Sequence, residues 1–191
     1  MTIERGHNVT IIRLASPDGT NRLTRNLVAE LTDAVQRLSE ESSPKPLIIT
    51  GNDGFFSAGA DLQEIATLLA CTALEFARAG QALMNLVARF PAATCAAISG
   101  YCMGGGLDLA LACQRRLAAP NAVFGHRGAA LGLITGWGGT QRLPRLIGKG
   151  RALQMFVAAE KVSAARALAI GLVERIVDNP VDTAITLLID R

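Results

Sequence analysis

Two glycine-bearing segments carry the residues whose spacing suits chemistry on an oxygen that becomes negatively charged. They are residues 55–62 (FFSAGADL) and residues 99–108 (SGYCMGGGLD). Each follows a predicted buried strand and leads into a predicted helix, so that small residues let a ligand approach backbone amides that lack partners. The positive end of a helix favours negative charge at the same place. If the two segments face each other, their amides form an oxyanion hole, worth roughly 3–4 kcal/mol per donor.

Other catalytic patterns are missing from the sequence. Neither segment contains a G-x-G-x-x-G or G-x-x-x-x-G-K-[ST] phosphate-binding pattern. There is no G-x-S-x-G motif, and the two histidines, His7 and His126, stand far apart without an acidic cluster. We therefore expect neither a hydrolytic triad nor a metal site. The simpler alternative is that both segments are only turns between a strand and a helix, with glycine where φ is positive.

Alternating strands and helices are predicted around these segments. From Thr24, apolar residues recur at helical spacing until Pro44 and Pro46. A second helical region covers residues 62–90 with a break near 71–72, and a third follows the glycine triplet to about residue 113. The remainder is expected to be mainly helical, and strands are predicted at residues 8–14, 47–50, 94–99, 116–119, 122–124 and 172–177. The pattern predicts one α/β domain.

Composition narrows the class of protein. With 191 residues, 50% of them hydrophobic and 18% charged, the chain is long enough for one packed domain. A net charge of +3 and 4% aromatic residues argue against nucleic-acid binding. Residues 92–113 contain one charge, but a glycine triplet interrupts them, which argues against a membrane span. Four cysteines without a C-x-x-C pair, and no signal peptide, predict reduced thiols in a cytoplasmic protein.

Several separated motifs, in this order, resemble the enoyl-CoA hydratase/isomerase (crotonase) family. They are FFSAGADL, ISGYCMGGGLDLALAC, VFG, LGLITGWGGTQRLPRLIGKGRALQM and SAARALAIGLVERIV. The resemblance implies an α/β fold with a crotonase-like spiral of ββα units, and assembly as a homotrimer or hexamer. It also implies an acyl-CoA-binding core at residues 1–177, followed at 178–191 by the start of a shortened C-terminal helical region, because the family's C-terminal helices are apparently truncated here.

The same resemblance assigns site residues. The backbone amides of Ala60 and Gly105 would be the oxyanion donors, and Asp108 would be the catalytic side chain. Coenzyme A would be part of the substrate, an acyl-CoA thioester, with no separate cofactor. The substrate-binding residues implied are Ala58, Gly59, Ala60, Asp61, Leu62, Gln63, Gly104, Gly105, His126 and Trp137.

The sequence departs from the family at the two catalytic glutamates. Asp108 stands at the first position, one methylene shorter, and a displacement of that size is costly to catalysis. Gly128 stands at the second position, and glycine cannot transfer a proton. We therefore expect an enzyme of this family, a lyase or isomerase, that stabilises a thioester enolate but is a poor hydratase. The alternative is a catalytically silent crotonase-fold protein that binds ligands or partners.

The remaining polar and aromatic residues near the glycine segments have competing interpretations. Asp108 is either a general acid/base or an acid that only stabilises a helix N-terminus. His126 is either a proton carrier or a hydrogen-bonded structural histidine. Arg127 binds an acidic acyl group, pairs with Asp108 or is a solvated surface residue. Trp137 is expected to pack beside the acyl pocket, and Cys102 to behave as a small hydrophobe.

Overall fold

A computed structural model describes residues 1–189 of the chain, and its core is a six-stranded sheet in the order β1-β2-β3-β5-β7-β10. The edge pair β1–β2 is antiparallel and the other pairs are parallel. The strands are β1 (Thr2–Arg5), β2 (Thr10–Arg13), β3 (Leu47–Thr50), β5 (Thr94–Ile98), β7 (Arg115–Ala118) and β10 (Arg175–Ile176). The central strands β3 and β5 are buried along their whole length, as expected of strands covered on both faces.

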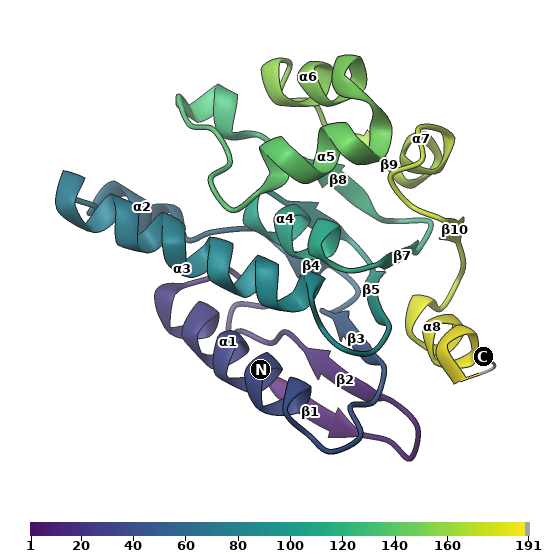
Figure 1. The fold of residues 1–191 in the computed structure, drawn as a ribbon. Helices are drawn as coiled ribbons and strands as arrows, with labels where there is room; N and C mark the ends of the chain where they lie inside the picture. The colour runs from purple at the N-terminus through teal and green to yellow at the C-terminus, as the bar shows by residue number, and fades with distance from the viewer. Residues whose placement is uncertain (190–191) are drawn as a thin grey trace.

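A second sheet of four strands has the order β4-β6-β8-β9. Its members are β4 (Phe55–Ser57), β6 (Tyr101–Met103), β8 (Val123–Gly125) and β9 (Val162–Ser163). Three successive turns of the chain each place one strand in the first sheet and the next in the second, and a helical segment follows. This is the predicted spiral of ββα units (Figure 1).

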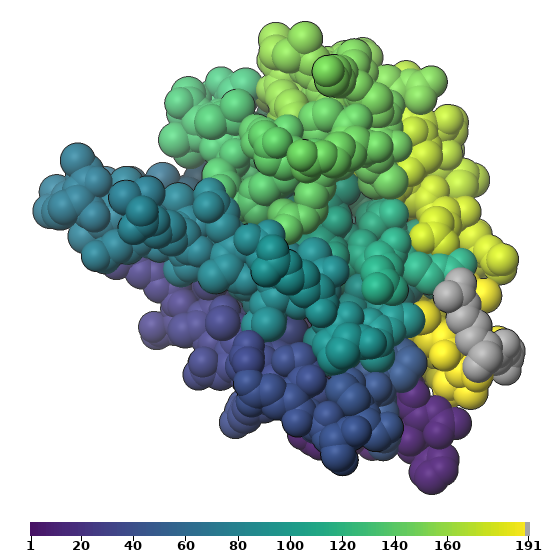
Figure 2. Space-filling view, viewed as in Figure 1, coloured from purple at the N-terminus to yellow at the C-terminus, as the bar shows by residue number. Residues whose placement is uncertain are grey.

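Helices surround the two sheets (Figure 1). The Thr24 hydroxyl caps the first one by accepting a hydrogen bond from the Leu27 amide, and the apolar stripe of that helix enters the core. The space-filling view shows the segment around α2 and the start of α3 projecting from the body of the molecule (Figure 2). The helices are α1 (Arg25–Ser39), α2 (Leu62–Ala66), α3 (Ala70–Ala88), α4 (Gly105–Ala112), η1 (Gly128–Leu131), α5 (Gly139–Ile147), α6 (Lys149–Val157), α7 (Ala164–Ala169) and α8 (Pro180–Ile189).

The strands that sequence patterning missed are short. Strands β4 and β6 have three residues each and β9 has two, too few to show an alternating pattern. The exposed edge strand β1 was also missed, because it lacks an apolar face towards the core. The helical region 62–90 is interrupted at residues 67–69 rather than at 71–72. The second helix begins where the Leu69 amide donates a hydrogen bond to the Thr72 hydroxyl.

Two further predictions bear on the class of protein. Among residues 1–189, no helix is both long and apolar enough to cross a membrane. Cys95, Cys102 and Cys113 are buried and Cys71 is exposed, and all four are free thiols. Burial raises the pKa of the Cys102 thiol well above its usual range, which fits a small hydrophobe rather than a nucleophile.

Candidate active site

The two glycine-bearing segments lie against each other because β4 and β6 pair as parallel strands. A Cβ built on Gly105 would lie 3.3 Å from the Ala60 nitrogen, and one built on Gly59 would lie 3.2 Å from the Gly105 nitrogen. In the turns, loops and helix ends of residues 1–189, neither the Ala60 amide nor the Gly105 amide donates a backbone hydrogen bond. The arrangement provides two neighbouring unpaired donors, as an oxyanion hole requires.

Backbone conformation explains why glycine stands beside each donor. Gly59, which precedes Ala60, has φ +96°, and Gly104, which precedes Gly105, has φ +49°. Both values lie in the region that ordinary side chains disfavour. Gly104 is also the residue before α4, so that the Gly105 amide is the first of that helix.

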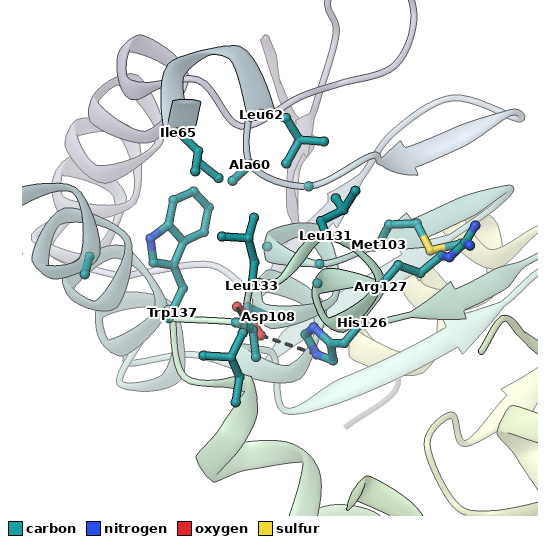
Figure 3. Close-up of a pocket in the computed structure, with 18 of the residues that line it drawn as sticks. Ala60, Leu62, Ile65, Met103, Asp108, His126, Arg127, Leu131, Leu133 and Trp137 are labelled. Atoms are coloured by element: carbon teal, nitrogen blue, oxygen red, sulfur yellow. Dashed lines mark hydrogen bonds and ion pairs between the residues drawn. The ribbon is translucent and has the colours of Figure 1, made fainter. Parts of the chain in front are cut away.

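A cavity of about 400 Å³ opens beside these amides (Figure 3). Among the described residues 1–189, Asp108 is the one carboxylate in its lining, and most of the wall is apolar. Among the substrate-binding residues predicted from the sequence, Asp61 and Gln63 are not part of the wall. The Asp61 carboxylate instead caps α2 by accepting hydrogen bonds from the Gln63 and Glu64 amides. The predicted residues in the lining are Ala58, Gly59, Ala60, Leu62, Gly104, Gly105, Asp108, His126 and Trp137.

Asp108 lies on the first turn of α4 and is 1% exposed. One carboxylate oxygen, Oδ2, accepts a hydrogen bond from the Thr135 hydroxyl. Burial raises the pKa of this carboxyl from 3.8 to about 6, and the Thr135 hydrogen bond, the charge of Arg142 and the nearby backbone amides of Trp137 and Gly139 oppose that rise. The other oxygen, Oδ1, is buried without a hydrogen-bond partner. Asp108 is thus a buried carboxylate held at Oδ2, while Oδ1 makes no hydrogen bond of normal geometry to the described residues.

His126 follows β8 in the second sheet and is 3% exposed. Its Nε2 lies 3.5 Å from Asp108 Oδ1, the contact drawn as a dashed line in Figure 3. Burial lowers the pKa of His126 to about 4, so the ring is neutral near pH 7 and the contact is not an ion pair. Neither ring nitrogen has a hydrogen-bond partner. No side chain or backbone group among residues 1–189 therefore supplies the hydrogen bond that the interpretation as a structural histidine requires.

Gly128 is the first residue of η1, and Leu133, five residues later, packs against it. The Leu133 amide donates a 2.8 Å hydrogen bond to the Gly128 carbonyl. A Cβ on Gly128 would lie 2.7 Å from the Leu133 carbonyl oxygen. The position at which the resemblance implied a second glutamate therefore lacks a carboxylate, and a Cβ there would lie too close to the Leu133 carbonyl oxygen.

Sequence reasoning missed two residues that act on Asp108. Thr135 holds the carboxylate, and Arg142 contributes the positive charge that affects its pKa. Both come from the segment after β8, far from Asp108 in sequence, so that no local motif signals the contact. Arg127 is exposed at the edge of the cavity and points away from Asp108 in Figure 3. Trp137 is buried beside the cavity, with its ring against Phe76, as expected.

The sequence model of the enoyl-CoA hydratase/isomerase family matches residues 4–187. The chain belongs to this family. The crotonyl-CoA hydratase of Syntrophomonas wolfei is 38% identical over 176 residues, which are 92% of this chain and 68% of that protein. The predicted family, and with it the prediction of an enzyme of the hydratase/isomerase type, is confirmed.

Two solved structures match the fold closely. Pseudomonas aeruginosa DspI superposes with a TM-score of 0.94 at 37% identity, covering 99% of this chain and 73% of that one. An enoyl-CoA hydratase from Bacillus anthracis gives 0.93 at 35% identity, covering 98% and 74%. The predicted crotonase-like fold is confirmed.

Replacement of Gly105 by Ala tests the close packing of the enoyl-CoA hydratase/isomerase fold at this point. The new Cβ would lie 2.6 Å from the Trp137 ring and would have to displace the indole or the amide. We expect a lower thermal midpoint, corresponding to about 1–3 kcal/mol of lost stability. Gly150→Ala in α6 is the matched control, because a Cβ there has no neighbour within 4 Å. Equal midpoints for both variants in thermal unfolding would contradict the packing described.

Proposed function

We propose that this protein binds acyl-CoA thioesters and stabilises a thioester enolate between the amides of Ala60 and Gly105. The observation that carries the proposal is the pair of unpaired amides beside a cavity with one buried carboxylate. Relatives matched in sequence include a crotonyl-CoA hydratase and, in human mitochondria, a methylglutaconyl-CoA hydratase, which is 36% identical over 177 residues. Both names describe enzymes that act on coenzyme A thioesters.

In this proposal Asp108 Oδ1 is the base. It takes a proton from the carbon next to the thioester carbonyl, and the electron pair of that C–H bond moves into the enolate. The negative charge then collects on the carbonyl oxygen, where the two amide N–H groups donate hydrogen bonds. A carboxyl with a pKa of about 6 is ionised near pH 7 and is a stronger base than an ordinary aspartate.

Among enolate reactions, the site favours a double-bond shift over the addition of water. Hydration requires a second positioned group that holds and deprotonates water. Gly128 supplies none, and His126, whose pKa burial lowers to about 4, is a weak base for water. A shift of the double bond needs only that one proton leave the α-carbon and one reach the γ-carbon. The apolar wall, which includes Leu62, Leu131 and Leu133, suits an aliphatic acyl group.

Three finer assignments belong to the same proposal. Coenzyme A enters as part of the substrate, and the segment from Ala60 to Gln63 contacts it. Residues 1–177 form the acyl-CoA-binding core, and 178–189 belong to the C-terminal helical region; the last two positions of the predicted region, 190–191, lie outside the described residues. The protein assembles as a homotrimer or hexamer; exposed apolar residues on α6, Leu153 and Val157, support an association surface.

The test is incubation with a panel of acyl-CoA thioesters, followed by mass and chromatographic analysis of the products. The panel contains β,γ-unsaturated, α,β-unsaturated and saturated aliphatic thioesters of several lengths. We expect conversion of β,γ-unsaturated to α,β-unsaturated thioesters without a change of mass. Binding of these thioesters without conversion of any of them would contradict the proposal and would favour the silent binding protein instead.

A further inference from the structure

The lining of the cavity contains three buried polar atoms without hydrogen-bond partners, and they lie together. They are Asp108 Oδ1, His126 Nδ1 and His126 Nε2, and within residues 1–189 no other buried side-chain nitrogen or oxygen lacks a partner. Buried polar atoms are rarely left unpaired, and each unpaired one costs about 1–3 kcal/mol. Their cluster in the wall of a cavity indicates that the site is arranged for something other than stability.

The surroundings hold the two side chains in fixed positions. Thr135 binds Asp108 Oδ2, so that the carboxylate cannot turn. The His126 ring lies against the Phe156 ring, with centroids 5.1 Å apart. The absence of a side chain at Gly139 leaves room for the contact between Asp108 and His126, because a Cβ there would overlap Asp108 Oδ1 and lie 2.9 Å from His126 Nε2.

The distance between Asp108 Oδ1 and His126 Nε2 decides whether the two groups hold a water molecule between them or pass a proton directly. A water molecule placed in line between them, with normal hydrogen bonds to both, would need about 5.5 Å. Asp108 Oδ1 and His126 Nε2 are 3.5 Å apart, which excludes such a water but leaves little more than a hydrogen-bond length. The distance suits direct passage of a proton from one group to the other.

We propose that His126 is a second catalytic group of this site, receiving from Asp108 the proton taken from the substrate and delivering it to another carbon of the same substrate. The inference rests on the proposed enolate function and supplies the proton donor that Gly128 cannot. Asp108 is short and held by Thr135, so it reaches one carbon. The α- and γ-carbons of an unsaturated acyl chain are two bonds apart, and a neighbouring carrier serves the second of them.

The steps balance for a β,γ-unsaturated thioester. Asp108 Oδ1 takes the α-proton, and the substrate becomes a dienolate held by the Ala60 and Gly105 amides. The proton passes from Oδ1 to His126 Nε2, leaving a carboxylate and an imidazolium. The imidazolium then protonates the γ-carbon, the thioester carbonyl re-forms and the double bond lies between the α- and β-carbons. Both side chains return to their starting states, and nothing is oxidised or reduced.

The electrostatics of the pocket favour the delivery of the proton to carbon. Transfer from the Asp108 carboxyl, with a pKa of about 6, to the His126 imidazole, with a pKa of about 4, is uphill, and protonation of the γ-carbon completes it. Burial lowers the pKa of His126 to about 4, so its imidazolium is a strong acid towards carbon. The carboxylate of Asp108 and the dienolate are both negative and stabilise the imidazolium during its short life. The other charge acting on Asp108 is Arg142, which binds Asn85 through a 2.8 Å hydrogen bond.

The test separates removal of the α-proton from delivery of the γ-proton in His126→Gln, which keeps a neutral polar side chain of similar size. We expect about a hundredfold slower isomerisation of a β,γ-unsaturated thioester. Exchange of the α-protons of a saturated thioester with deuterated water should stay within about threefold of the unmodified protein, since Asp108 performs that step. His7→Ala, at the other and exposed histidine, should change neither rate.

Two results overturn the relay. One is isomerisation by His126→Gln at the rate of the unmodified protein, and the other is an equal loss of isomerisation and of α-exchange, which indicates a structural role. Either result leaves the enolate function standing, because the unmodified protein is measured alongside. Absence of α-exchange in the unmodified protein itself would instead contradict the proposed function.

Discussion

Replacement of Asp108 by Asn should lower kcat/KM for isomerisation of a β,γ-unsaturated acyl-CoA by about 10²–10⁴-fold, because the amide cannot take the α-proton. The same variant should be more stable than the unmodified protein near pH 7. Burying an ionised carboxylate is costly, and the raised pKa of Asp108 measures that cost. Loss of activity together with a gain of stability is the combination that a buried catalytic acid predicts and a structural acid does not.

The stability gain should depend on pH in a definite direction. The pKa of Asp108 is about 6 in the folded protein against a usual 3.8, so the folded chain holds more protons between about pH 4 and pH 6. The contribution of Asp108 to stability therefore falls as the pH rises through that window, whereas the lowered pKa of His126 acts in the opposite direction in both the unmodified protein and the variant. We expect Asp108→Asn to raise the free energy of unfolding by about 1–3 kcal/mol at pH 7.5 and to have little effect near pH 4.

Urea unfolding at the two pH values, together with kinetics at pH 7.5, measures both effects. The exposed carboxylate of Asp53 provides the matched control, because Asp53→Asn should alter neither activity nor stability. An Asp108→Asn protein that keeps its activity, or that is less stable at pH 7.5, would show that the carboxylate serves packing rather than proton transfer.

Hydration of crotonyl-CoA should be about 10²–10⁴-fold slower than by a relative with two carboxylates in its site, measured side by side. The missing group cannot simply be restored. The Cβ of Glu in Gly128→Glu would lie 2.7 Å from the Leu133 carbonyl oxygen, and the turn at residues 128–133 would have to open. We therefore expect no gain of hydration from Gly128→Glu, alone or combined with Asp108→Glu.

The comparison requires only the disappearance of crotonyl-CoA and the formation of its hydroxyacyl product over time. A matched relative, the crotonyl-CoA hydratase of Syntrophomonas wolfei, is a suitable reference. Hydration by the unmodified protein within about tenfold of that reference would contradict the interpretation of Gly128. A large gain in Gly128→Glu would show that the backbone there has more room than the turn allows.

The parts of the fold that could be predicted from the sequence are those with a strong local signal. The helix after Thr24 and the strand β3 have clear apolar patterns and lie where they were expected. Strands β4 and β6 carry the glycine-bearing segments but are three residues long, so their pairing emerges only from the assembled sheet. The family resemblance supplied the spiral of ββα units that short-range patterns could not.

The candidate site was predictable in its backbone and less so in its side chains. The segments around Ala60 and Gly105 could be identified because positive φ and close approach demand small residues. The Thr135 contact and the unpaired nitrogens of His126 depend on a loop whose path has no sequence signature. The tight return of the chain onto Gly128 was likewise invisible, because a lone glycine does not reveal what lies against it.

Formation of an enolate is the central claim, and deuterium exchange measures it without assuming the reaction that follows. A saturated aliphatic acyl-CoA is incubated with the protein in deuterated water, and mass analysis follows deuterium at the α-carbon. We predict that the unmodified protein exchanges the α-protons with kcat/KM about 10²–10⁴-fold above that of Asp108→Asn. No exchange above the uncatalysed rate, with the thioester shown to be bound, would contradict the account.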